Sequence, residues 1–284
     1  MIKIHFTNSR GRTIELYGAP YRLSRFDGFG DVDAGIQTQV APYQDGETFL
    51  DTKLEARHIE LELKISGKDE LDFLEKRRML TTVFNPKLGL GLLKYTDKSG
   101  SKIIHAVAES VPNLLSGNEN HGPTHQKAIV YLKAPNPYWR SPQITEDPAF
   151  EPRFHFPFSG SFIMGIQRDR RIIDNTGDAP APIQVEFFGP ALNPRIINNT
   201  TGEYIKVNQQ LQEGERMLID TTDGQKSVFF VSENGERRNV FNWIDLGSSF
   251  FKLQIGENDI EYTADSDIQG REVNISYHTL YASL

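Results

Sequence analysis

The 284-residue sequence predicts a mainly β protein with one α-helix, in which an N-terminal domain of sheet and helix precedes a C-terminal β-sandwich. Residues 58–65 alternate between apolar and polar side chains, the period of a strand with one face in a core. The following segment, 68–84, has the features of a capped helix. From residue 183 onward, apolar runs alternate with turn clusters at intervals of roughly 8–12 residues, which is typical of a sandwich.

The first elements of the N-terminal domain are short strands. Residues 2–6 and 12–17 are apolar segments that flank the turn Asn8-Ser9-Arg10-Gly11, so an opening hairpin is predicted. In the strand at 58–65, the inward-facing residues are Ile59, Leu61, Leu63 and Ile65. Further strands are predicted at 89–95, 102–110 and 127–134.

The single helix is predicted to begin after Ser66-Gly67-Lys68-Asp69, a variant capping box, and to end before Asn85-Pro86. At ~100° per residue, one side of this helix carries Phe73, Leu80, Val83 and Phe84. Leu71 and Leu74 lie off this apolar stripe. Two interpretations remain open: a neighbouring subunit covers these leucines, or a loop of the same chain does.

A domain boundary is predicted where prolines are dense. Pro135, Pro137 and Pro142 fall within eight residues, which favours domains at 1–140 and 141–284 with a hinge near 135–152. Trp139, inside this junction, is expected to pack between the domains. Trp243 is expected to fill the core of the sandwich.

Composition excludes several classes of function. The formal net charge is −7, and Lys and Arg are interspersed with Asp and Glu, so we expect no specific nucleic-acid binding. No apolar stretch approaches the ~20 residues of a membrane span, and no secretory signal is visible. The chain contains no cysteine, which excludes thiolate metal sites and thiol nucleophiles.

The motifs of common enzymes are missing from the sequence. There is no nucleophile elbow, zinc helix or phosphate-binding loop. His121 and His125 have the spacing of two metal ligands on a helix, but Gly122 and Pro123 between them disfavour that helix. We therefore expect no catalytic residue, no cofactor and no metal.

The order of several short motifs resembles the distal tail protein family of long non-contractile-tailed bacteriophages. In the first half these are Asp45-Gly46, Arg57 at the start of the alternating strand, Asn85-Pro86, Gly89-x-Gly91-x-Leu93-x-Tyr95, Glu109-Ser110-Val111-Pro112 and Ala134-Pro135-Asn136-Pro137-Tyr138-Trp139. In the second half they are Asn175-x-Gly177-Asp178, Asn193-Pro194, Thr200-Thr201-Gly202-Glu203, Ile219-Asp220-Thr221 and Gly256-x-Asn258. Each motif alone is common, and their order along nearly the whole chain carries the resemblance.

The resemblance implies a structural, non-enzymatic component of the virion, placed at the tail tip after assembly in the host cytoplasm. It implies that the N-terminal domain forms a hexameric ring and that a galectin-like sandwich lies outside it. The ring would join the major tail tube protein to the tail-tip hub protein and receptor-binding proteins, and DNA would pass through it. No membrane is implied.

Within such a ring, Leu71 and Leu74 are candidates for the subunit interface. Four carboxylates are candidates to line the channel, since an acidic wall would not retain DNA: Asp45, Glu47, Asp51 and Glu55. Their segment, 45–55, is predicted to be a loop-like excursion between strands, and an exposed loop on the outside of the ring is the alternative.

A second function stays open at this point, namely a glycan-binding β-sandwich module on a tail or cell surface. A closed ring in particle images would support the scaffold, and a glycan-binding monomer would support the alternative.

Overall fold

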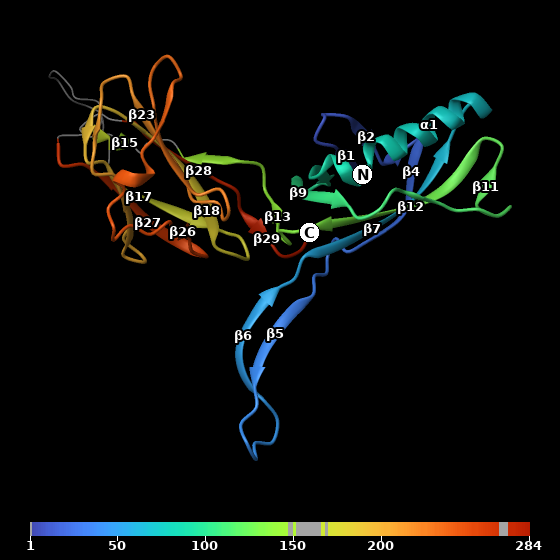
Figure 1. The fold of residues 1–284 in the computed structure, drawn as a ribbon, viewed down its shortest axis with the longest axis horizontal. Coiled ribbons are helices and arrows are strands. Elements are labelled where there is room, and N and C mark those ends of the chain that lie inside the picture. The colour runs from blue at the N-terminus through green and yellow to red at the C-terminus, as the bar shows by residue number, and fades with distance from the viewer. Residues whose placement is uncertain (1, 147–149, 152–165, 168–169, 267–271) are drawn as a thin grey trace, which may run out of the picture. The chain divides into compact units, whose positions relative to one another are not determined.

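The computed structural model describes residues 2–146, 150–151, 166–167, 170–266 and 272–284. The chain forms two compact units (Figure 1). Unit 1 consists of Met1–Pro142 together with Tyr281–Leu284, and unit 2 consists of Gln143–Leu280. The mainly β fold with one α-helix that the sequence predicts is confirmed for the described residues.

The main sheet of unit 1 is antiparallel and closes on itself. Its strands follow the order β2-β1-β8-β9-β12-β7-β4-β3. Their bounds are β1 (Lys3–Thr7), β2 (Thr13–Glu15), β3 (Tyr17–Gly18), β4 (Tyr21–Asp27), β7 (Arg57–Ser66), β8 (Gly91–Thr96), β9 (Ser101–Ala108) and β12 (His125–Ala134). Short strands β10 (Asn113–Leu114) and β11 (His121–Gly122) pair with β12, and β13 (Trp139–Arg140) pairs with β9 and with β29 (Leu280–Tyr281).

The closure occurs at Leu16, the one residue between the two terminal strands β2 and β3. Its N–H donates to the carbonyl of Ile4 in β1 (2.8 Å), and its carbonyl accepts from the N–H of Leu23 in β4 (3.0 Å). A single continuous segment therefore pairs with both ends of the sheet, and the result is a barrel. Closure removes the exposed sheet edges that would invite aggregation.

Helix α1 (Glu70–Val83) is two residues shorter at its start than the predicted 68–84, because Asp69 is the N-cap. The Asp69 carboxylate accepts from the N–H of Asp72 (2.9 Å), and the Asp72 carboxylate accepts from the N–H of Lys68 (2.9 Å). Ser66 is the last residue of β7 instead. The helix ends at the C-cap Phe84, and the one-turn 3-10 helix η1 (Pro86–Leu88) follows.

The predicted apolar stripe of α1 faces the interior of the barrel, because Phe73, Leu80, Val83 and Phe84 are all buried in the core of unit 1. The same core contains the inward-facing residues of β7 and β12. Trp139 also belongs to this core: it is fully buried, and its Nε1 donates to the carbonyl of Phe29 (3.0 Å). The expectation that Trp139 packs between the domains is therefore wrong.

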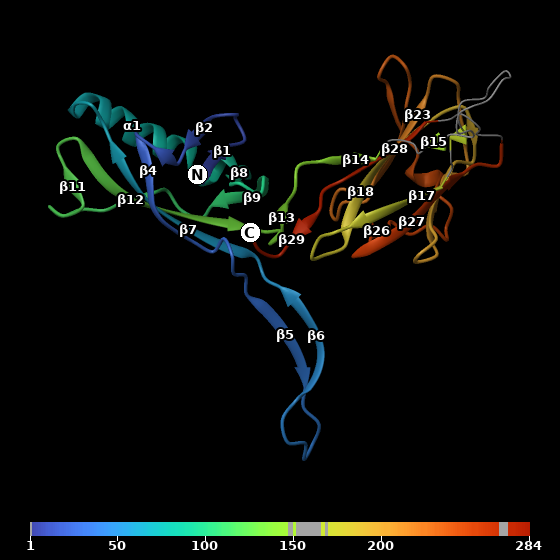
Figure 2. The same ribbon diagram turned by 180° about the vertical axis from the view of Figure 1, so that it is seen from behind.

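Unit 2 contains two antiparallel sheets that share one core (Figure 2). The larger has the order β14-β28-β18-β23-β24-β25, with β26 also on β18, and the smaller has the order β17-β27-β20-β21. Their bounds are β14 (Ile144–Glu146), β17 (Arg170–Asn175), β18 (Ala181–Phe188), β20 (Arg195–Asn198), β21 (Glu203–Lys206), β23 (Arg216–Asp220), β24 (Ser227–Val231), β25 (Arg237–Asn239), β26 (Lys252–Leu253), β27 (Gly256–Thr263) and β28 (Val273–Tyr277). Two-residue pairs, β15 (Phe150–Glu151) with β16 (Ile166–Gln167) and β19 (Ala191–Leu192) with β22 (Gln210–Leu211), and the 3-10 helix η2 (Phe241–Trp243) complete the described elements.

Two of the motif residues of unit 2 are buried asparagines that satisfy backbone groups at turns. Asn175 donates to the carbonyls of Ala179 and Leu253 and accepts from the N–H of Gly177. Asn258 donates to the carbonyl of Gln254 and accepts from its N–H. Because buried backbone groups need partners, these asparagines fix the turns that connect the two sheets.

The end of the chain departs from the expected division at 1–140 and 141–284. Residues 281–284 belong to unit 1, since the Arg57 side chain of β7 donates to the carbonyl of Ala282 and Lys102 of β9 donates to the carbonyl of Ser283. Among the described residues, no helix combines the length and apolarity needed to cross a bilayer.

Candidate functional site

The most exposed element of unit 1 is the hairpin formed by β5 (Ala34–Gln39) and β6 (Thr48–Leu54), which lies in the chain between β4 and β7. It is a two-stranded sheet of its own and extends away from the barrel (Figure 1). The sequence prediction of a loop-like segment at 45–55 is wrong over most of its length, because β6 pairs with β5 from Leu54 to Thr48. The tip turns through Tyr43 and Gly46, which both have positive φ angles.

The register gives the hairpin two chemically different faces. Side chains of directly paired residues lie on the same face, and an irregularity after Gln37 leaves Leu50 as the extra residue of β6. We call the apolar face the set Ala34, Ile36, Thr38, Phe49, Thr52 and Leu54, which contains no charge. We call the polar face the set Gly35, Gln37, Gln39, Thr48, Asp51 and Lys53, which contains no large apolar side chain.

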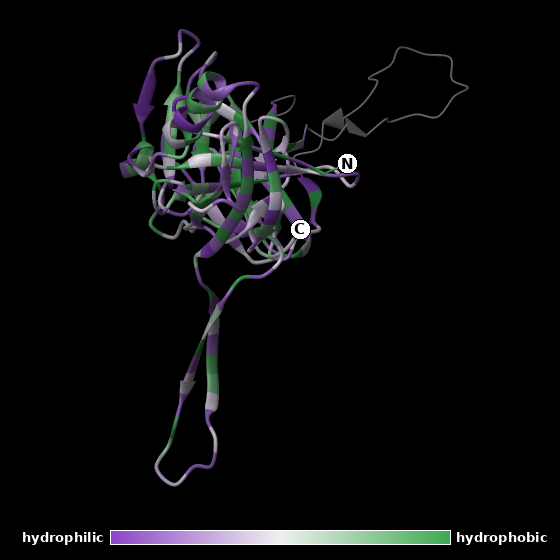
Figure 3. Ribbon diagram, turned by 90° about the vertical axis from the view of Figure 1, so that its right-hand side faces the viewer, coloured by the Kyte–Doolittle hydropathy of each residue, from purple (hydrophilic) through white to green (hydrophobic). Residues whose placement is uncertain are grey.

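The apolar face is uncovered in the described chain. Ile36 is 65% exposed and Phe49 is 63% exposed, and Val40, Tyr43 and Leu50 near the tip are also exposed. Figure 3 shows that hydrophobic segments alternate with hydrophilic ones along the hairpin. An isolated two-stranded hairpin is at best marginally stable in water, and exposed apolar surface of this kind marks interaction sites. The hairpin therefore has the properties of a segment that is covered by another molecule.

All four candidate channel carboxylates lie on this hairpin and are exposed. Asp45 and Glu47 belong to the tip, and Asp51 lies on the polar face opposite Gln37. Glu55 follows β6 at the base, where its carboxylate lies beside Gly35 of the polar face.

Leu71 and Leu74, the candidate interface residues, lie on the outer side of α1, 76% and 47% exposed. No segment of the described chain covers them.

The base of the hairpin is held by a buried arginine that the sequence analysis did not single out as functional. Arg57 is 1% exposed, and its guanidinium donates to the carbonyls of Gly28, Phe29 and Asp31 just before β5. Burial lowers the pKa of Arg57, although arginine stays charged at any physiological pH. The one signal in the sequence for this role was the place of Arg57 in the motif order. A cation at the start of a strand needs hydrogen-bond acceptors if its side chain is buried.

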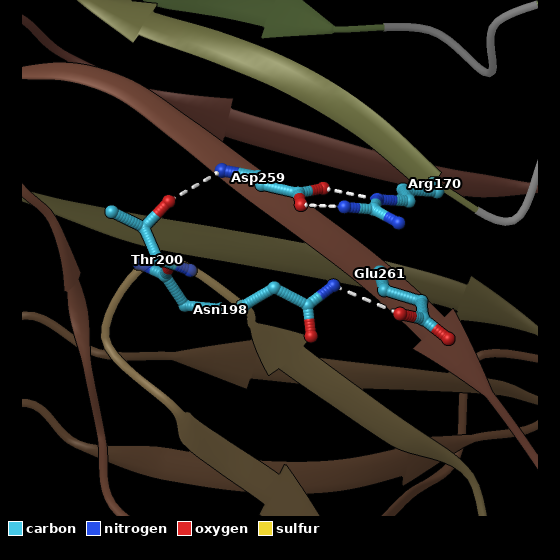
Figure 4. A network of polar contacts seen from close by, with 6 residues as sticks. Arg170, Asn198, Thr200, Asp259 and Glu261 are labelled. Carbon is cyan, nitrogen blue, oxygen red and sulfur yellow. Dashed lines mark hydrogen bonds and ion pairs between the residues drawn. The ribbon is translucent and has the colours of Figure 1, made fainter.

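The outer face of the smaller sheet of unit 2 carries a network of polar contacts (Figure 4). Arg170 binds both oxygens of Asp259 through two nitrogens, and the N–H of Asp259 donates to the hydroxyl of Thr200 (3.0 Å). The side chain of Asn199 donates to Glu261 (2.8 Å). The hydrogen bonds from Arg170 hold the pKa of Asp259 below its ordinary value. These groups largely satisfy one another, as on a solvated sheet face.

The same face offers no free aromatic platform among its described residues. Tyr204, its aromatic residue, has the guanidinium of Arg195 over its ring at 4.1 Å, and its hydroxyl donates to Asp245 (2.6 Å). Trp243 is partly buried against the core of unit 2. Glycan stacking, which the alternative function needs, is thus not favoured on this face of the smaller sheet.

His121 lies on the two-residue strand β11 and His125 on β12, so the pair is not on a helix. The described residues contain no group of three or more His, Asp or Glu side chains placed to hold a metal ion.

Two family models match the chain, one in each unit. The phage tail protein RIFT-related domain matches residues 9–120, and the C-terminal domain of the siphovirus-type tail component matches residues 176–281. No curated protein sequence matches.

Solved structures of phage proteins share the fold over nearly the whole chain. The SPP1 Dit protein, described as a paradigm of the hub adsorption apparatus in phages that infect Gram-positive bacteria, is 13% identical with a TM-score of 0.69, and the match covers 99% of both chains. A chain of the phage P2 baseplate in its activated conformation with calcium is 10% identical with a TM-score of 0.59 and covers 97% of this chain and 98% of that one. The motif order, the two family models and the shared fold agree, and the chain belongs to the distal tail proteins of siphophages, structural components of the virion tail tip.

Proposed function

We propose that the protein forms a closed ring of six copies, which joins the tail tube to the hub and the receptor-binding apparatus and through which DNA passes. The protein catalyses no reaction in this role. The number of copies and the identity of the neighbours, namely the major tail tube protein, the tail-tip hub protein and receptor-binding proteins, rest on the resemblance to the distal tail family. The similar structures belong to a hub adsorption apparatus and to a baseplate, which is consistent with these neighbours.

The proposal of a ring rests on the amphipathic character of the hairpin. Its apolar face exposes Ile36 and Phe49 within one chain, while every charge of the two paired strands lies on the opposite face. A ribbon with this division is stabilised when its apolar face packs on protein and its polar face remains in water. In a ring, each copy can supply the protein surface for the hairpin of its neighbour.

The exposed surface of unit 1 favours a second copy of this chain as the molecule that covers the hairpin. The exposed apolar residues of unit 1 include those of the hairpin and, on the outer side of α1, Leu71 and Leu74, and a second copy of the chain could cover both surfaces. A contact between unlike surfaces of identical chains is head-to-tail, and such contacts produce a ring when the rotation closes.

The polar face and the tip would then line the channel. Asp45, Glu47, Asp51 and Glu55 outnumber the one cation of this segment, Lys53. Six copies carry a formal charge of 6 × −7 = −42. An acidic wall repels the phosphate backbone, whereas a basic one would gain counterion-release energy and retain DNA.

The experiment is a pair of charge substitutions on α1, Leu71→Asp with Leu74→Asp. The double variant should remain folded, because both side chains are exposed, and its mass in solution should fall from that of the ring to that of one chain. A matched control is Leu192→Asp with Leu246→Asp, two exposed leucines of unit 2. Loss of assembly in the control as well, or an intact ring in the α1 variant, would contradict the proposed interface.

A further inference from the structure

The last four residues of the chain are anchored to unit 1 by side chains of two barrel strands. The ammonium group of Lys102 lies 4.3 Å from the centre of the Tyr281 ring and donates to the carbonyl of Ser283 (3.4 Å). Arg57 donates to the carbonyl of Ala282. These contacts come from β9 and β7, so residues 281–284 are part of the structure of unit 1.

Arg57 joins this tail to the base of the hairpin. One terminal nitrogen of its guanidinium donates to Gly28, Phe29 and Asp31, which lead into β5, and the other donates to Ala282. All of its hydrogen-bond acceptors in the described chain are backbone carbonyls. Its Nε also donates to the carbonyl of Pro137 (2.9 Å). Since none of these hydrogen-bond acceptors is a carboxylate, the buried guanidinium depends on the carbonyls, because an unpaired N–H cannot be hydrated there.

Both strands of the hairpin begin close to the Arg57 guanidinium and its acceptors. On the entering side, Gly28 has a φ of 77°, and a Cβ there would lie 1.9 Å from the carbonyl oxygen of His58, so this backbone is pressed against β7. On the leaving side, only two residues separate the end of β6 from Arg57, and the N–H of Glu55 donates to the carbonyl of Asp33 (2.8 Å). The direction of the hairpin is therefore set at its base, where the guanidinium of Arg57 donates to the backbone carbonyls.

We propose that Tyr281–Leu284 is a strap that fixes the direction of the β5–β6 hairpin, with Arg57 and the carbonyl of Ala282 as the positioning groups. Without the strap, the guanidinium loses its acceptor at Ala282 and keeps the carbonyl of Pro137. Its contacts to Gly28, Phe29 and Asp31 then loosen. The hairpin then samples other directions while the barrel remains closed. The consequence for ring assembly rests on the function proposed above, but the effect on the hairpin does not.

The test compares a chain that ends at Leu280 with one that lacks only Leu284 and keeps every anchoring contact. Both are made in the Leu71→Asp, Leu74→Asp background, so that subunit contacts do not contribute to the readout. Hydrogen exchange is measured at residues 33–36 and 52–55, at the base of the hairpin, and at β1 and β8 of the barrel. Arg57→Lys, which keeps the charge but not the fork of donors, is the second variant.

In the chain ending at Leu280, exchange at the base of the hairpin should rise by about tenfold, the factor expected from loss of one charge-assisted hydrogen bond. Exchange in β1 and β8 should stay within about twofold of the control. Arg57→Lys should give the same pattern. Unchanged exchange at the base overturns the proposal, and so does an equal rise in the barrel, since the tail would then only stabilise the unit.

The oligomeric state of the same truncation in the otherwise natural chain gives a separate outcome. If the full chain assembles and the truncated chain does not, the strap serves assembly. If the full chain never assembles, the proposed ring fails, but the exchange result still decides whether the strap exists.

Discussion

The ring of Phe84, which ends α1, stacks on the ring of Phe6 in β1 with their centroids 4.5 Å apart and their planes inclined by 20°. Both side chains are buried in the core of unit 1. The contact joins the end of the helix to the strand on which the barrel closes, so helix and barrel should unfold together.

Replacement of Phe84 by alanine should destabilise unit 1 by about 3–5 kcal/mol, the usual cost of removing a fully buried phenylalanine. Unit 2 should be unaffected, because its core is a separate cluster. Calorimetry should show the transition of unit 1 moving to lower temperature alone. Phe241→Ala, at a half-exposed site of unit 2, is the control and should cost less than about 1 kcal/mol. Parallel shifts of both transitions would show that the units do not unfold independently.

The stability of unit 1 should fall at high pH through Tyr21. Burial, and secondarily the charge of Asp72, raises the pKa of Tyr21 from 10.0 to about 12, and its hydroxyl donates to the carbonyl of Lys76 in α1 (3.0 Å). The folded state thus binds this proton more tightly than the unfolded state. The stabilisation is complete below pH 10 and is lost as the pH rises through 12. Urea unfolding of unit 1 between pH 9 and pH 12 should show this loss, and Tyr21→Phe should reduce it. If Tyr21→Phe has the same pH profile as the natural chain, the loss of stability at high pH comes from other tyrosines.

The two faces of the hairpin should respond differently to charge. Ile36→Asp with Phe49→Asp should abolish assembly, because carboxylates cannot be buried unpaired against a neighbouring chain. Gln37→Asp with Thr48→Asp places the same charges on the polar face of the same ribbon and should leave the assembly intact. Light scattering after gel filtration measures both. Equal loss of assembly in the two variants would mean that the division into faces does not determine the contact.

Reversing the charge of the hairpin should convert the channel into a DNA-binding surface. With Asp45, Glu47, Asp51 and Glu55 changed to lysine, the ring should retain duplex DNA at low salt, with an affinity that falls steeply as salt rises. Changing Glu213, Glu233, Glu236 and Glu257 of unit 2 to lysine reverses as many exposed charges elsewhere. If the unit 2 variant retains DNA equally well, the carboxylates of the hairpin do not line the channel.

The sequence predicts those elements whose pattern is local. The alternation from Ile59 to Ile65 and the apolar stripe from Phe73 to Phe84 each describe one face of one element, and the structure confirms both. The helix start was displaced by two residues because Asp69, which also belongs to the predicted capping box, is the residue that caps.

What the sequence did not predict depends on contacts between distant residues. Closure of the barrel requires Leu16 to pair with strands on two sides, and the return of residues 281–284 requires acceptors for Arg57, 225 positions earlier than Ala282. The strand at Ala34–Gln39 has few strong strand-forming residues, and it becomes a strand because it pairs with Thr48–Leu54. The roles of Leu71, Leu74 and the four carboxylates remain predictions.

Electron microscopy of the purified protein tests the ring most directly. The account predicts closed particles with six-fold symmetry and a central channel, in which the apolar face of each hairpin lies against the next subunit and Asp51 faces the channel. Particles that remain single chains at every concentration, or rings in which Ile36 and Phe49 stay exposed to solvent, would contradict it.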